Sequence, residues 1–421
     1  MIGTSEQESL RADATDPVPS MRDRFELPQA RDGSSAIYVC GHSLGPLPRG
    51  ARELIEEETD AWARLGVGGH FRAEAPWFTY SDLLAEPTAR VVGARPPEVV
   101  TMNSLTVNLH QLFATFYRPT RARYKVLIEQ GSFPSDRYAV VSQLRHHGVD
   151  ADDGLVLAGP RDGEQVLRTT DIEALIERER DALALVWLPG VQYVTGQVLE
   201  IERITTAGHA VGALVGWDLA HAVGNVQLSM HDWAADFAVW CTYKYLNAGP
   251  GAVGQAFIHE RWADDADLIR LAGWWGNDPE TRFEMPFAFE PRAGAASWQA
   301  SNPSILALAP LRASLALFEE VGIERLRERS VRLTSYLLNL LDELVGVEVV
   351  TPAAESERGA MLSLRVAHRS REVERGLADR GVILDFREPD IFRLALAPLY
   401  NTYHEAWRFV HLLRVVTAEL G

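Results

Sequence analysis

Apolar and polar residues follow two different periods along the chain, and their order predicts an α/β protein. Residues 49–65 place apolar side chains three or four positions apart, which predicts an amphipathic helix after the turn Gly45–Pro48. Beyond it, short apolar runs typical of buried strands alternate with helix-like segments. The predicted strands are Val99–Met102, Lys125–Glu129, Leu155–Ala158, Leu183–Leu188, Ala213–Trp217 and Phe237–Thr242. This alternation is typical of a doubly wound, mostly parallel sheet.

The pattern changes near residue 305. Two long amphipathic helices, 306–321 and 324–344, precede predicted strands near 347–351, 360–366 and 391–396 and a last helix from about 403. We therefore expect a large domain over 51–305 and a smaller C-terminal α/β domain over 306–421. Residues 21–50 are expected to form an N-terminal arm that packs with the small domain. The polar residues 1–20 are expected to be flexible.

Composition narrows the class of protein. The 421 residues, 47% hydrophobic and 24% charged, fit a globular chain of two domains. No apolar run is long enough to span a bilayer and the polar start has no signal-peptide pattern, so we expect a cytoplasmic protein without a membrane partner. The formal charge of −17 argues against a nucleic-acid partner, because phosphate binding needs a basic face.

Cysteines and histidines are not placed as in a disulfide framework or a metal site. The two cysteines, Cys40 and Cys241, make no disulfide framework and do not have the spacing of a metal site. The pair His146–His147 lies in a polar stretch without other ligand residues, which is typical of surface histidines. We predict that the protein binds no metal.

Lys244 is the first candidate for chemistry. It follows the apolar run 237–243 and precedes the turn 247–251, which contains two glycines and a proline. Desolvation at the end of a buried strand favours a neutral amine, which suits a nucleophile or base in Schiff-base chemistry. A lysine that extends its charge into solvent fits this segment equally well.

Asp218 strengthens the case for such chemistry. It ends the apolar run 212–217, as at the carboxyl end of a parallel strand, where α/β sheets place ligand groups. A buried carboxylate needs a cationic partner, and the protonated ring nitrogen of pyridoxal 5'-phosphate (PLP) is one. An aspartate at a strand end is by itself more often a cap or a loop ligand. Together with Lys244 on the next strand end, Asp218 favours a PLP site.

A PLP site also needs an anion-binding element for the phosphate. The segment 102–110 ends a strand and begins a helix at Leu105 and Thr106, with Asn103 or Ser104 as the cap, so its backbone N–H groups attract an anion. An ordinary capped helix fits the same residues. The loop 131–138 is a second candidate, in which Phe133 could stack on a cofactor ring or belong to the core.

Seven segments together resemble the kynureninase family. They are MNSLTVNLH (102–110), FPSDRYA (133–139), VQYVTGQ (191–197), the block 216–251, GWWG (273–276), SNP (301–303) and LAPLYN (396–401). The resemblance runs in order from about Ile37 to Asn401. It implies a fold-type-I PLP enzyme, a homodimer with active sites shared between subunits. It also implies hydrolytic Cβ–Cγ cleavage of 3-hydroxykynurenine or kynurenine to 3-hydroxyanthranilate or anthranilate, plus L-alanine.

The resemblance also assigns roles by position. It implies that Lys244 carries PLP as a Schiff base and acts in catalysis with Asp218 and Tyr243, while Arg393 binds the substrate carboxylate. The implied cofactor-binding residues are Leu105, Thr106, Phe133, Pro134, Ser135, Asp136, Asp218, His221, Tyr243, Lys244, Trp274 and Asn302. Trp274 and Asn302 are expected to reach the site across the dimer.

The resemblance implies that three positions determine the choice between kynurenine and 3-hydroxykynurenine, and in this chain they are His70, Ser301 and Asn302. Polar residues at these positions resemble those of the family branch that prefers 3-hydroxykynurenine. Hydrogen-bond donors favour the hydroxylated ring, because beside a ring without the hydroxyl they stay unpaired, at a cost of about 1–3 kcal/mol. We expect that preference, although His70 could equally be a helix cap.

The chain departs from the family pattern at two positions. His42 stands where the family commonly has an asparagine, and Pro189 stands where a hydroxyl residue is often found. These departures leave room for a ring-substituted kynurenine as the substrate. An aminotransferase or a cysteine desulfurase would share the strand-end Asp and Lys, but neither Cys40 nor Cys241 is placed as a desulfurase nucleophile.

Overall fold

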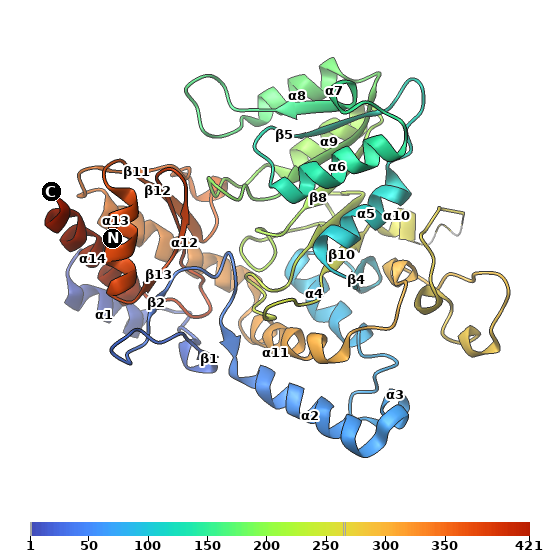
Figure 1. Cartoon of the computed structure of the whole chain (residues 1–421), viewed down its shortest axis with the longest axis horizontal. Coiled ribbons are helices and arrows are strands. Elements are labelled where there is room, and N and C mark those ends of the chain that lie inside the picture. Colours follow the sequence, from blue (N-terminus) through green and yellow to red (C-terminus); the bar gives the residue numbers. More distant parts are fainter. Residues whose placement is uncertain (1, 264, 266) are drawn as a thin grey trace.

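The computed structural model describes residues 2–263, 265 and 267–421, and it forms a large and a small α/β domain (Figure 1). The large domain is built on a seven-stranded sheet with the order β4-β10-β9-β8-β7-β5-β6. These strands are β4 (Val99–Thr101), β5 (Lys125–Glu129), β6 (Leu155–Ala158), β7 (Leu183–Pro189), β8 (Leu214–Asp218), β9 (Phe237–Trp240) and β10 (Gln255–Ile258). Neighbours from β6 to β9 are parallel, whereas β10 is antiparallel to both β9 and β4.

Alternate residues of the central strands pack on opposite faces of this sheet. On β5, Val126 and Ile128 belong to one apolar cluster and Leu127 to another. The first cluster includes residues of α5 (Leu105–Phe116) and α6 (Pro134–His146). The second includes residues of α4 (Ala85–Val92), α8 (Thr169–Arg178), α9 (Ile201–Ala210) and α11 (Ile305–Val321). The predicted doubly wound, mostly parallel sheet is therefore confirmed.

The six strands predicted for this domain are present, with ends that differ by at most two residues. The pattern missed β10, because its first residue is polar. Gln255 is fully buried, where its side chain bonds to Thr88, Thr101 and Trp240. Such partners come from distant segments and leave no local signal.

The small domain contains a four-stranded antiparallel sheet with the order β11-β12-β15-β14. Its strands are β11 (Val347–Val349), β12 (Met361–Val366), β14 (Asp385–Arg387) and β15 (Ile391–Ala395), covered by α12 (Ile323–Leu341), α13 (Ser370–Asp379) and α14 (Tyr403–Leu420). Helix α11 packs on α2 (Arg49–Leu65), and its buried residues belong to the core of the large domain. The two cores divide within α12, between Leu326 and Leu333, rather than near residue 305.

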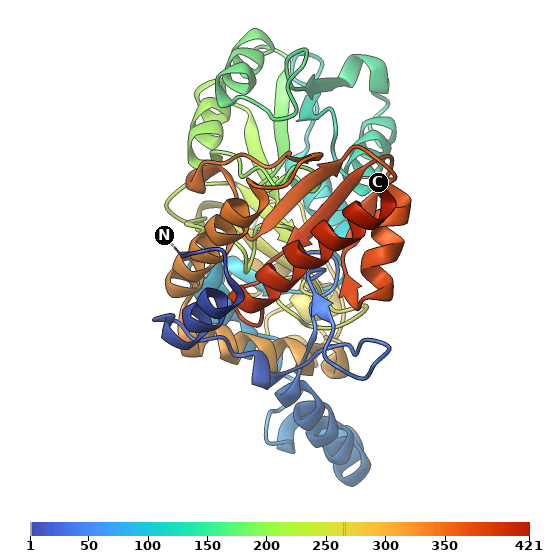
Figure 2. The same ribbon diagram turned by 90° about the vertical axis from the view of Figure 1, so that its left-hand side faces the viewer.

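The N-terminal arm crosses to the small domain. Strand β2 (Ile37–Tyr38) pairs with β13 (Val382–Ile383), and Ile37 and Val39 lie in the small-domain core. Helix α1 (Glu6–Thr15) lies against α14 (Figure 2).

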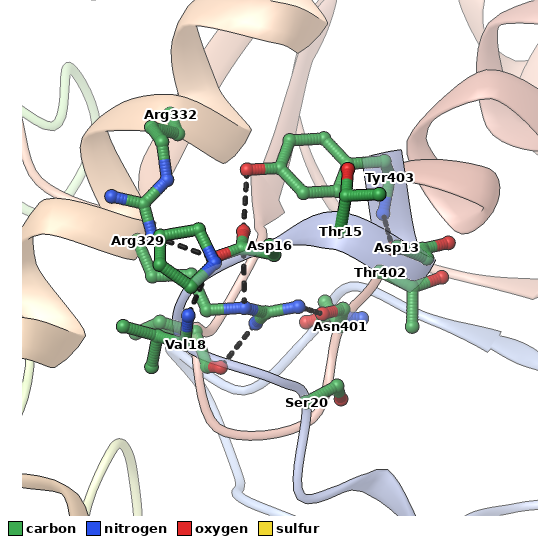
Figure 3. Close-up of polar contacts among 12 residues, drawn as sticks. Asp13, Thr15, Asp16, Val18, Ser20, Arg329, Arg332, Asn401, Thr402 and Tyr403 are labelled. Carbon is green, nitrogen blue, oxygen red and sulfur yellow. Dashed lines mark hydrogen bonds and ion pairs between the residues drawn. The ribbon is translucent and has the colours of Figure 1, made fainter. Parts of the chain in front are cut away.

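Residues 2–20 differ from the expected flexible segment, because polar side chains anchor α1 to the C-terminal helices; residue 1 of the expected segment lies outside the described residues. Asp16 accepts hydrogen bonds from the Tyr403 hydroxyl at 2.7 Å, Arg332 at 2.6 Å and the Val18 amide at 2.9 Å (Figure 3). Asp13 accepts from the backbone amides of Tyr403 and His404 at the start of α14. In the described part of the chain, no helix has the length and apolar character needed to cross a membrane.

Candidate active site

One cavity of about 310 Å³ lies at the carboxyl ends of the large-domain strands and reaches the small domain. The last residues of three parallel strands line it: Glu129 of β5, Pro189 of β7 and Asp218 of β8. The remaining lining residues are His42, Ser43, Leu105, Thr106, Phe133, Ser135, Asp136, Val191, Tyr193, Ala220, His221, Tyr243, Lys244, Arg387 and Arg393. The fold therefore collects most of the predicted site residues at the edge of the sheet where α/β proteins bind ligands.

Lys244 and His221 are in direct contact in this cavity. Lys244 lies four residues beyond the end of β9, and its Nζ is 3.0 Å from Nε2 of His221. Burial, together with the charge of Lys244, lowers the pKa of His221 well below its ordinary value. His221 is therefore a neutral imidazole beside the amine.

Two buried carboxyl groups, those of Asp136 and Asp218, interact with each other in the same cavity. Burial, followed by the charge of Asp218, raises the pKa of Asp136 well above its ordinary value. Oδ1 of Asp136 has no hydrogen-bond partner in the described part of the structure, and Asp218 uses its Oδ1 to accept from the Ala220 amide at 2.7 Å. A cationic ring nitrogen is the kind of partner that such a pair lacks.

Glu129 is a third carboxyl group in the cavity, and it is not among the site residues predicted from the sequence. Burial raises the pKa of Glu129 to about 7, and its Oε2 is unpaired within the described residues. The signal was the same as for Asp218, since Glu129 also ends a predicted apolar strand.

The N-terminus of α5 lies at the cavity, where Leu105 and Thr106 are lining residues. Ser104 is the N-cap residue, but its side chain makes no capping hydrogen bond. Asn103 does not cap the helix either, because its side chain donates to Asn108 and Gln111. The capping expected from the sequence is thus absent, which leaves first-turn N–H groups for an anion. The Thr106 hydroxyl lies 2.8 Å from that of Ser135 on α6.

The small domain contributes cations at the opposite end. Arg393 lies on β15 and Arg387 on β14, and both bond to Asp385. His42 is completely buried beside them, and burial lowers its pKa to about 4. Of these residues, Arg393 was predicted as a site residue from the sequence and His42 was noted only as a departure from the family pattern, whereas Asp385 and Arg387 were not predicted.

Five predicted site residues do not line the cavity. Pro134 begins helix α6, and His70, Trp274, Ser301 and Asn302 lie elsewhere on the large domain. Trp274 belongs to an aromatic surface that we define by Phe71, Phe78, Trp274 and Phe283. The ring centroids of the contacting pairs lie 5.6–6.2 Å apart. His70 packs beside Phe71, and the backbone at Ala300 contacts Trp275.

The two cysteines are unsuited to nucleophilic chemistry. Burial raises the pKa of Cys40 to about 11, and burial also raises the pKa of Cys241. Neither side chain lines the cavity.

Solved structures with the same fold are PLP enzymes. A mutant of C-DES with glycine covalently linked to its PLP cofactor aligns with a TM-score of 0.75 at 17% identity, over 93% of this chain and 98% of that one. The cysteine desulfurase CsdA from Escherichia coli aligns with a TM-score of 0.75 at 17% identity, over 94% and 98%. The fold is therefore that of the fold-type-I PLP-dependent enzymes.

Sequence comparisons identify the family within this class. The model of the kynureninase C-terminal domain matches residues 326–413. A kynureninase from Koribacter versatilis is 52% identical over 97% of this chain and 96% of its own length. Another, from Myxococcus xanthus, is 51% identical over 97% and 96%. The chain belongs to the kynureninase family, and it is a PLP-dependent hydrolase that acts on carbon–carbon bonds.

The cavity fits PLP. The uncapped N-terminus of α5 with Thr106 suits the phosphate, and Asp218 keeps an oxygen for the ring nitrogen. Lys244 is the amine within the same cavity. The chain contains one other lysine, Lys125, and this residue is bonded to Glu179 outside the cavity.

Proposed function

We propose that this enzyme hydrolyses the Cβ–Cγ bond of 3-hydroxykynurenine, and of kynurenine less efficiently, to release an aminobenzoate and L-alanine. The observation that carries the proposal is the meeting of Lys244, Asp218 and Arg393 in one cavity of a chain about half identical to kynureninases. Arg393 binds the substrate carboxylate, because a planar guanidinium matches a carboxylate with two hydrogen bonds.

Bound PLP supplies an electron sink for cleavage of bonds at the substrate α- and β-carbons. Lys244 holds the cofactor before substrate arrives and afterwards moves a proton with its Nζ. His221, being neutral, accepts a hydrogen bond from that amine without adding charge. Asp218 keeps the ring nitrogen protonated.

Tyr243 is the proton donor for the later steps. Burial raises the pKa of its hydroxyl, so the group stays protonated at neutral pH. It lies next to Lys244 and lines the same cavity. Its other role is a hydrogen bond to the cofactor phosphate.

The functional unit is a homodimer in which Trp274 and Asn302 complete the cavity of the other subunit. Several large rings of the aromatic surface face solvent in one chain: Phe71 is 60% exposed, Phe283 54% and Trp274 42%. Apolar patches of this kind are typical of protein interfaces. Figure 1 supports the placement, since α3 (Gly69–Arg72) and the segment after 268 lie on the side of the large domain away from the small domain.

The preference for 3-hydroxykynurenine follows from the same assembly. His70, Ser301 and Asn302 are polar and accessible on this surface, so a second subunit would receive them as donors beside the substrate ring.

A side-by-side assay tests the reaction. PLP-loaded protein is given kynurenine or 3-hydroxykynurenine, and the aminobenzoate and alanine are measured together. Stoichiometric products with a higher kcat/KM on the hydroxylated substrate support the proposal. An equal or higher value on kynurenine contradicts the preference, and turnover of neither substrate points to a ring-substituted kynurenine or to another reaction such as transamination.

Subunit mixing tests the shared site. Lys244→Ala and Asn302→Ala proteins are each expected to be nearly inactive. Randomly mixed subunits should recover about a quarter of wild-type activity, because half of the dimers then contain one intact site. Dimers that form without any recovery would contradict the role of Asn302 across the interface.

A further inference from the structure

The register of the small-domain sheet brings two arginines to the cavity and places one carboxylate beside them. Asp385 on β14 is the direct cross-strand partner of Arg393 on β15. Arg387 is two residues beyond Asp385, so both side chains leave the same face of the strand. The backbone therefore fixes this cluster before any ligand binds.

The hydrogen bonds of Arg393 leave one edge of its guanidinium free. Nε and Nη2 both bond to Oδ2 of Asp385, and Nη1 donates to the Tyr193 carbonyl at 2.6 Å. Each terminal nitrogen keeps one further N–H, and within the described residues these have no partner. These remaining N–H groups, one on each terminal nitrogen, can donate to the oxygens of a carboxylate.

The cluster has a net positive charge. Burial disfavours the charged form of Asp385, but interaction with His42 and the charge of Arg393 outweigh this and hold the pKa of Asp385 well below its ordinary value. Nε2 of His42 lies 3.8 Å from Oδ2 of Asp385, and the low pKa of His42 keeps that ring neutral. Arg387 donates to the same Oδ2 at 3.1 Å. Two cations therefore surround one anion.

We propose that Asp385 is the positioning residue that aims the free edge of Arg393 at the substrate carboxylate, and that Arg387 supplies the second charge for this carboxylate. The inference deepens the proposed function and rests on it for the identity of the substrate. It concerns one property of the site, which is that it selects an α-amino acid with a free carboxylate.

A purely structural ion pair would behave differently. Loss of such a pair would loosen the small domain and weaken every ligand to the same extent. Loss of the correct orientation of Arg393 weakens the binding only of ligands that carry the carboxylate, since the rest of the cavity is unchanged.

The test measures binding rather than turnover. PLP-loaded protein is titrated with L-alanine and with L-alaninamide, which lacks the carboxylate, and Kd is read from the cofactor absorbance. Asp385→Glu keeps the charge but displaces the guanidinium, and it should weaken L-alanine by about tenfold or more. Arg387→Gln should weaken L-alanine by about three- to tenfold. Both variants should bind L-alaninamide within about twofold of wild type.

Asp390→Glu is the matched control, because Asp390 pairs with Arg365 in the same domain outside the cavity. It should leave both ligands unchanged. Equal weakening of both ligands by Asp385→Glu, or no change in either, would overturn the inference. If that protein does not fold, the half-exposed Arg387 carries the test alone. Selective loss of L-alanine in a protein that cleaves no kynurenine would retain this inference and reject the proposed reaction.

Discussion

Two buried aspartates of this molecule, Asp16 and Asp136, have opposite surroundings. Asp16 uses both carboxylate oxygens for hydrogen bonds to Tyr403, Arg332 and Val18 (Figure 3). Burial opposes its ionisation, but the Tyr403, Val18 and Arg332 hydrogen bonds lower its pKa. Within the described residues, Oδ1 of Asp136 has no hydrogen-bond partner. The pKa of Asp136 is raised, because burial and the charge of Asp218 both act against ionisation.

The difference separates a structural carboxylate from a functional one. A buried carboxylate that only holds the fold is expected to be paired within the chain, since an unpaired polar group costs about 1–3 kcal/mol. Among the carboxyl groups of the described residues, buried oxygens without a partner occur at Glu129 and Asp136, which line the cavity where a ligand can pair them. Substitutions in the two regions should therefore affect different properties.

The largest effect is expected from Lys244→Ala. Loss of the amine removes both cofactor attachment and proton transfer, so kcat should fall by about 10⁴-fold or more. Lys125→Ala is the matched control, as it removes the other lysine, and it should keep nearly full activity. Steady-state kinetics of both proteins check this, and substantial activity in Lys244→Ala would place the chemistry elsewhere.

Asp16→Ala should change stability and leave the chemistry intact. It leaves Arg332 and Arg329 without their buried partner, which should lower the free energy of unfolding by about 3–5 kcal/mol. Urea unfolding measures the loss, with the exposed Asp23→Ala as control. The contribution of Asp16 to the free energy of unfolding should disappear as the pH falls through the lowered pKa of this carboxylate. An Asp16→Ala protein of wild-type stability with a reduced kcat/KM would contradict the structural role of Asp16.

Glu129→Gln should have a smaller effect that depends on pH. The folded chain keeps Glu129 protonated up to about pH 7, whereas the unfolded chain ionises this residue near pH 4. The free energy of unfolding of the wild type therefore decreases as the pH rises from about 4 to about 7. In cofactor-free protein, the variant should match wild type near pH 4 and exceed it by up to about 3 kcal/mol at pH 8. Glu53→Gln, at an exposed position, should show no such trend. A constant difference across pH would contradict the raised pKa.

Thr106→Val should have the smallest effect. It removes one hydroxyl from the anion-binding end and should weaken PLP by about tenfold or less, as for a single hydrogen bond. Ser104→Ala is the control, because that side chain makes no capping bond. Equal loss of PLP affinity in both variants would argue against a specific role for Thr106.

Local pattern predicted the fold and half of the cavity well. Asp218 and Lys244 could be found because each follows an apolar strand, and strand ends converge in a parallel sheet. Glu129 had the same signal and was overlooked.

The other half of the cavity depends on contacts between distant segments. His42 in the N-terminal arm meets Asp385 on β14 only after the small domain has folded. Helix α1 is anchored in the same way, because Asp13 and Asp16 accept hydrogen bonds from the amide and the hydroxyl of Tyr403. Polar residues in such positions look like solvated surface until their partners are known.

The most direct test of the account is to locate the PLP attachment. The holoenzyme is reduced with borohydride, digested and mapped by mass spectrometry, and Lys125 serves as the internal control. The account predicts that the cofactor mass is found on the peptide containing Lys244 and is absent from the peptide containing Lys125. A cofactor label on Lys125, or on neither lysine, would contradict it.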